Sequence, residues 1–112
     1  RRAREREAEY MLMAAEARRE DAKARASGEL GIAWSMYAQG RETLRLLEHT
    51  LLPQAQATRD ASQAALSSGK VDFDSVIEAE RQLIDIRTQR LKTELDTRLA
   101  LTEIKKLTGD LK

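Results

Sequence analysis

The chain has 112 residues, of which 35% are charged, 4% are aromatic and none is cysteine, so a thick globular core is not expected and disulfides and thiolate metal sites are excluded. Its 20 basic and 19 acidic residues are interleaved, for a net charge of +1; this pattern is typical of solvated helix faces and argues against nucleic-acid binding. Alanine, leucine, glutamate, arginine and lysine dominate, which favours one small domain of long helices.

A first long helix is predicted over about residues 3–66. Its apolar residues recur at spacings of three, four and seven, most clearly at Ala33, Tyr37, Leu44, Leu47 and Leu51. Gly28 and Gly31 predict a soft spot, because each glycine costs about 1 kcal/mol relative to alanine inside a helix. Pro53 predicts a kink or a local restart, since proline removes a backbone hydrogen bond and crowds the preceding turn.

A turn is predicted over residues 67–72, where the chain reverses. Gly69 follows the last apolar residue of the first helix, the usual place for a left-handed C-terminal cap. Asp72 or Asp74 can then cap a second helix over about residues 73–108.

The second helix carries its apolar residues on two adjoining stripes and is expected to end at Gly109. One stripe repeats every seven residues at Ile77, Ile84 and Leu91, and the other runs beside it through Val76 and Leu83. A two-helix hairpin needs only one seam, so the second stripe implies contacts outside this chain. The sequence therefore predicts an all-α fold of two long antiparallel helices in a coiled-coil-like hairpin.

Residues that could carry chemistry are few. His49 is the only histidine, and Met11, Met13 and Met36 are the only thioethers. A copper or silver site would need several of these to converge, and gap-filling methionines with a surface histidine are the favoured interpretation. No catalytic triad or phosphate-binding loop can be argued, so we expect no enzyme, no cofactor and no metal site.

No membrane-spanning helix is expected. The longest nearly apolar run covers residues 10–15, far below the ~20 residues that a spanning helix needs. The arginine-rich start is neither a signal peptide nor a lipidation site.

Three motifs occur in order along the chain: LLPQA at residues 51–55, GKVDFDSVIEAERQL at 69–83 and LTEIKKLTG at 101–109. Together they resemble the TolC-type outer-membrane efflux factors, and the first resembles their cation and heavy-metal branch (CzcC-like and CusC-like proteins). The resemblance covers nearly the whole chain and is most specific over residues 44–109.

The resemblance implies a trimeric parent protein with a β-barrel in the outer membrane of a Gram-negative bacterium and an α-helical barrel in the periplasm. Each protomer supplies two helical hairpins, and this chain resembles the second, without the β-strands and the first repeat. By the same resemblance, the hairpin tip docks a periplasmic adaptor, which joins an inner-membrane pump. The channel would be a passive conduit for cations or drugs.

The resemblance also assigns residues. The adaptor-facing tip would consist of Ser67, Ser68, Gly69, Lys70 and Val71. Two acidic positions that ring the closed entrance in TolC-like relatives fall on Ser75, which is not acidic, and on Glu78, which keeps its carboxylate. Three copies of Glu78 around a threefold axis would attract cations and repel one another, so protonation or cation binding would favour closure.

Other interpretations remain open at this point. The turn at Gly69 also fits an ordinary helical hairpin, a scaffold, or the coiled-coil hairpin of an adaptor. Adaptor hairpins usually carry an arginine, a leucine and a serine spaced around their tip, and the residues flanking Gly69 do not show that set. A soluble metal chaperone would have to bind copper or silver tightly, and we expect no such uptake.

Overall fold

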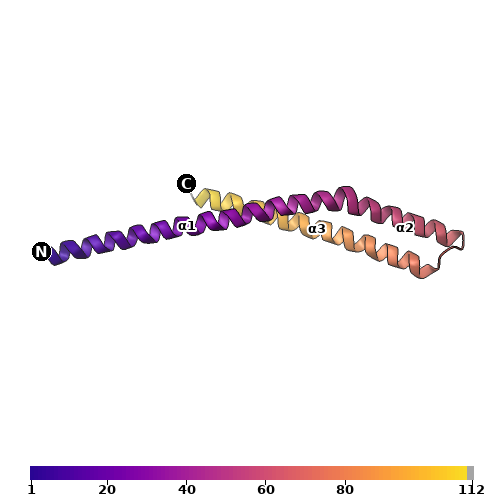
Figure 1. Cartoon of the computed structure of the whole chain (residues 1–112), viewed down its shortest axis with the longest axis horizontal. Coiled ribbons are helices and arrows are strands. Elements are labelled where there is room, and N and C mark those ends of the chain that lie inside the picture. The colour runs from indigo at the N-terminus through magenta and orange to yellow at the C-terminus, as the bar shows by residue number, and fades with distance from the viewer. Residues whose placement is uncertain (111–112) are drawn as a thin grey trace.

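The chain forms one extended antiparallel helical hairpin (Figure 1), seen in a computed structural model that describes residues 1–110. The first arm consists of α1 (Arg2–Leu46), a short π-helix η1 (Leu47–Leu51) and α2 (Leu52–Ser67), and the second arm is α3 (Phe73–Asp110). The described residues contain no strand. The predicted all-α hairpin is therefore confirmed.

The molecule is a rod rather than a globule. Its principal extents are 97 × 21 × 13 Å, and its radius of gyration is 26.6 Å, whereas a globular domain of this size has a radius of gyration of about 13 Å. The turn forms one end of the rod, and α1 extends past the described end of α3 at the other (Figure 1). Only a thin seam between the arms is hidden from solvent.

That seam follows a heptad pattern in which shielded residues alternate at steps of three and four. On α3 the seam positions are Val76, Ala79, Leu83, Ile86, Arg90, Thr93, Thr97, Ala100, Ile104 and Leu107, and Glu80, Glu94 and Leu101 beside them are half-buried. On the first arm the seam positions are Ala26, Leu30, Ala33, Tyr37, Gly40 and Leu44 of α1, followed by Leu47 of η1. This is the spacing of a coiled coil, in which apolar side chains of each helix pack between those of the other.

The helices approach closely where Gly40 of α1 meets Thr97 of α3. A methyl group on Gly40 would collide with Thr97 Oγ1, and its carbon would lie 3.1 Å from Thr97 Cβ. Thr97 is only 8% exposed, yet its hydroxyl is satisfied because it donates to the carbonyl of Thr93 at 2.7 Å. A glycine and a backbone-bonded threonine thus form a close contact in the seam.

The glycines other than Gly69 lie inside helices. α1 runs through Gly28 and Gly31 without interruption, so the expected soft spot is not a break, and α3 ends at Asp110, next to the expected end at Gly109. Among the glycines, only Gly69 has a positive φ, of 76°. A glycine ends a helix when the backbone turns left-handed, and at the other glycines it remains in the helical region.

Near Pro53 the sequence predicts a kink or a local restart, and the structure shows a restart, in which η1 separates α1 from α2. The N–H of Leu52 bonds the carbonyl of Leu47, five residues back, where an α-helix would bond four back. Pro53 then lies in the first turn of α2, where proline's missing N–H is least costly.

Candidate docking tip and outer face

The end of α2 is closed by its own backbone. The N–H of Lys70 bonds the carbonyl of Ala65 at 2.8 Å, and the N–H of Gly69 bonds that of Leu66 at 3.0 Å. This pair of bonds around a left-handed glycine is the Schellman motif, which satisfies the last carbonyls of a helix. The left-handed cap predicted at Gly69 is therefore confirmed.

The start of α3 is capped by Asp72, the first of the two candidates. Its Oδ1 accepts a hydrogen bond from the backbone N–H of Ser75 at 3.2 Å and another from the Ser75 hydroxyl at 3.0 Å. A carboxylate at this position satisfies free N–H groups and lies at the positive end of the helix dipole. The structure thus gives Ser75 a local part in the cap, which the sequence comparison with TolC-like entrances did not suggest.

The five predicted tip residues lie together at one end of the rod. Val71 is half-buried, and the other four, Ser67, Ser68, Gly69 and Lys70, are exposed. The Ser67 and Ser68 hydroxyls donate to carbonyls of their own helix, at Gln63 and Ala65. The tip therefore presents a small polar surface with one cation.

Glu78 and Ser75, the two predicted entrance positions, are both exposed on α3. They are three residues apart, so they share one face of the helix. Within residues 1–110 no hydrogen bond or ion pair joins Glu78 to another side chain. Its carboxylate is open to solvent.

Glu80, two residues further on, has a different position that sequence reasoning missed. It is half-buried, and its Oε1 accepts a hydrogen bond from Gln63 Nε2 of α2 at 3.2 Å. This is a bond between the two arms just behind the tip. Finding it requires the register of the arms, which the residue pattern alone does not state.

The outer face of α3 carries a line of exposed apolar side chains, here called the outer stripe. It consists of Phe73, Ile77, Ile84, Leu91, Leu95 and Leu99. The contrast with the seam is sharp, because Leu83 is 0% exposed whereas its neighbour Ile84 is 57% exposed. The predicted second stripe therefore does lie outside the hairpin, and large apolar lines of this kind mark interaction surfaces.

The outer stripe ends at a groove between the two arms. The groove has a volume of about 470 Å³, and its apolar lining comes from Ile32, Ala33 and Met36 of α1 with Leu99 and Ala100 of α3. Its remaining lining residues are three carboxylates, Glu29, Asp96 and Glu103. The outer face thus combines apolar area with an acidic margin.

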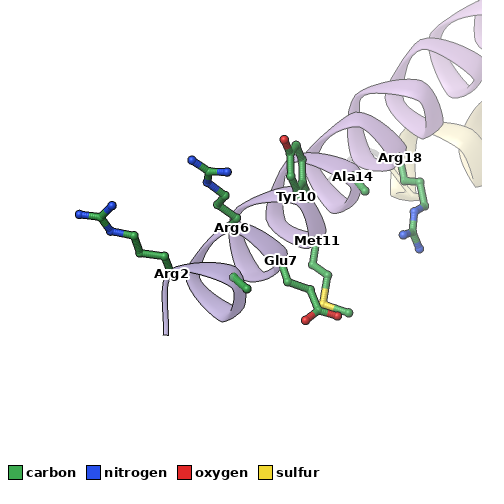
Figure 2. A pocket seen from close by; sticks show the side chains of 8 residues that line it. Arg2, Arg6, Glu7, Tyr10, Met11, Ala14 and Arg18 are labelled. Atoms are coloured by element: carbon green, nitrogen blue, oxygen red, sulfur yellow. The ribbon is translucent and has the colours of Figure 1, made fainter.

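The N-terminal part of α1 has a shallow hollow along a single helix. Figure 2 shows Arg6 and Tyr10 on one side of this helix and Glu7 and Met11 on the other. Met11 and Met13 are both exposed, and Met36 lies far along the chain in the groove. The three thioethers are thus not brought together.

His49 lies exposed in η1, apart from these methionines. Within the described part of the chain, no three histidine or carboxylate side chains are grouped so that they could hold a metal ion. No helix in residues 1–110 combines the length and the apolar character needed to cross a bilayer.

Comparison with protein-family models, with curated proteins and with solved structures finds no match to this chain.

Proposed function

We propose that this chain is the periplasmic helical hairpin of a TolC-like outer-membrane efflux channel. In this function it forms part of a trimeric channel wall, its tip docks a periplasmic adaptor linked to an inner-membrane pump, and cations or drugs pass through as cargo. The proposal rests on the three ordered sequence motifs and on the shape of the hairpin. The alternative is a hairpin scaffold or adaptor-type module without a channel.

Beside the motifs and the hairpin shape, the structural observation that carries the proposal is the outer stripe. The heptad seam already pairs α3 with the first arm, so the stripe is not needed to hold the hairpin closed. A helix with two apolar faces packs against neighbours on both of them. A wall of hairpins side by side uses one face within each hairpin and the other between hairpins.

The tip fits the docking role by its construction. The Schellman bonds close the end of α2 and the Asp72 cap closes the start of α3, so both helix ends at the turn are capped without a partner. The exposed side chains of Ser67, Ser68 and Lys70 can then contact an adaptor with little ordering cost.

The outer stripe gives the direct test. In the full-length channel protein that would contain this hairpin, Ile84→Glu and Leu91→Glu should abolish trimers and export, because each places a charge in an apolar contact. Gln89→Glu is the matched control, since it adds the same charge at an exposed position on the opposite side of α3. Native mass spectrometry and an export assay provide the measurements.

Three outcomes separate the candidates. Loss of trimer and export in the stripe variants alone supports the channel wall. Trimers that persist in both stripe variants contradict it. A native assembly that is not trimeric and does not conduct ions in a planar bilayer favours the scaffold.

The entrance role of Glu78 has its own test. Glu78→Gln removes three charges from one ring of the trimer, so the cation selectivity of single channels should fall. Glu103→Gln removes the same number of charges at the groove, far from the tip, and should leave selectivity unchanged. Equal selectivity in both variants and the native channel would remove Glu78 from the entrance.

A further inference from the structure

The heptad seam of the first arm contains one residue too many. From Leu47 the seam positions continue to Leu51, Ala55, Arg59, Ser62 and Leu66, and Leu52, Gln56 and Ala65 beside them are also half-buried. Steps of three and four alternate up to Leu51, but the steps to Ala55 and Arg59 are both four. A regular heptad would place Gln54 in the seam after Leu51.

η1 lies just before this extra residue and absorbs it. A π-helical turn closes with a bond to the fifth residue back, so it takes up one residue more than an α-helical turn. The wider turn keeps Ala55, the one buried residue of α2, directed at α3. The π-helix is therefore encoded by the residue count of the seam, in addition to any effect of Pro53.

If η1 became α-helical, α2 would present another face to α3. One residue in an α-helix corresponds to a rotation of about 100° and a rise of about 1.5 Å. The seam after Leu51 would then run through Gln54, Thr58, Ala61 and Ala65.

This second face is compatible with burial. The Thr58 hydroxyl donates to the carbonyl of Gln54 at 2.9 Å, so it would not be left without a partner. Thr97 already occupies a seam position with the same kind of bond to its own helix. Ala61 and Ala65 match the alanines that α1 already places in the seam at Ala26 and Ala33.

The observed face of α2 includes two polar residues in the seam. Ser62 is half-buried, and so is Arg59, which pairs with its own neighbour Asp60 at 3.0 Å rather than with α3. Across from η1 the fit is also imperfect. One heptad from the Gly40–Thr97 contact, Arg90 lies opposite Leu47, and its Nε is buried without a hydrogen-bond partner.

We propose that η1 is a register switch. In its π form the Ala55 face of α2 packs on α3, and in an α form the Thr58 face does so instead. The change rotates the α2 end of the turn while α3 stays in place. The tip side chains therefore take two orientations relative to α3. This inference rests on the pattern of the chain itself and does not depend on the channel function.

Two variants that differ by one residue test the switch. Pro53→Ala removes the proline and keeps the extra residue, so both registers should persist. Deletion of Pro53 removes the extra residue too, which makes Ala55 and Arg59 continue a regular heptad and locks the Ala55 face without a π-helix. The melting temperature of the deletion variant should exceed that of Pro53→Ala by on the order of 5 °C.

The register is read by distances between two spin labels on the 112-residue chain, which has no native cysteine. Labels at Ala57→Cys and Arg87→Cys occupy exposed positions on α2 and α3. Rotation of α2 should move the first label by on the order of 10 Å, since a helix with its side chains is that wide. The labelled chain with Pro53 in place and the labelled Pro53→Ala variant should each give two distances. The labelled Pro53 deletion should give only one of these two.

Deletion of Gln39 is the matched control. It removes one exposed residue from a stretch where the heptad is regular, so it should lower the melting temperature. A single distance in both the unaltered background and Pro53→Ala overturns the switch. So does a Pro53 deletion that fails to fold or melts no higher than the Gln39 deletion, because the extra residue would then not be in excess.

Discussion

At the residue scale, single atoms decide how close the two arms can come. Gly40 lacks a side chain where Thr97 crosses it, while Gly28 and Gly31 face open space with no atom within 4 Å of an added methyl group. Relative to alanine, glycine therefore stabilises the hairpin at Gly40 and destabilises it at Gly28 and Gly31. Helix propensity always favours alanine over glycine, but contact with α3 reverses the balance at Gly40.

This contrast can be measured with one substitution at two positions. Gly28→Ala should stabilise the chain by up to about 1 kcal/mol, the propensity difference. Gly40→Ala should destabilise it by about 1–3 kcal/mol, because the added methyl overpacks the seam. Guanidinium unfolding followed by circular dichroism gives both values.

The double variant Gly40→Ala with Thr97→Ala supplies the control. It removes the Oγ1 and Cγ2 atoms that the new methyl would meet, so stability should partly return. If Gly40→Ala were as stabilising as Gly28→Ala, the arms would not cross as closely as the structure shows.

At the scale of the element, α3 has two apolar faces with different energetic roles. Leu83 is fully buried in the seam, whereas Ile84 belongs to the outer stripe and is largely exposed. The free energy of unfolding of the isolated chain should therefore depend on the first residue and hardly on the second.

Leu83→Ala should lower the free energy of unfolding by about 2–5 kcal/mol, the range for a large buried side chain. Ile84→Ala should change it by less than about 1 kcal/mol, since little apolar area is hidden in the monomer. Both are measured by urea unfolding at low protein concentration. Equal losses at the two positions would mean that the outer stripe is covered even in the isolated chain.

The hairpin could be predicted from the sequence, and its finer features only in part. Gly69, which follows the last apolar residue of the first helix, predicts a turn, because glycine at this position usually forms a left-handed cap that ends a helix. Pro53 indicated a break but not its π form, which depends on keeping Ala55 in register with α3. Gly109 lies at the end of α3 but has no left-handed backbone, since glycine permits that conformation without requiring it.

The features of the tip could also be predicted only in part. Asp72 was one of two acceptable caps, and the choice depends on where the backbone turns into the helix, which propensity does not fix. The bond from Gln63 to Glu80 requires the register between the arms. The entrance assignment of Glu78 stays a prediction that awaits the conductance measurement.

At the scale of the whole molecule, stability is distributed unevenly along the rod. The hairpin portion has a seam, but residues 1–25 of the first arm are exposed throughout. A single helix without packing is marginal in water, because propagation contributes little per residue beyond a costly nucleus. The N-terminal arm of the isolated chain should thus open more readily than the hairpin.

Amide hydrogen exchange tests this directly. Residues 5–25 should exchange far faster than residues 76–107, which form the α3 side of the seam. Repeating the measurement over a range of protein concentrations is the control, since self-association would protect the arm at high concentration only. Protection of both regions to the same degree at low concentration would contradict the uneven distribution.

The outer stripe also has a pitch, and that pitch limits how hairpins can assemble. The seam repeats every 3.5 residues, which makes paired helices wind around each other in a left-handed sense. From Phe73 to Leu99 the stripe advances in steps of four and seven that average about 3.7 residues per turn, which exceeds the 3.6 of a straight helix. A repeat above 3.6 drifts in the right-handed sense, opposite to that of the seam. A neighbour packed along the stripe would therefore not follow the left-handed winding of the two arms, so the contacts within a hairpin and between hairpins would wind in opposite senses.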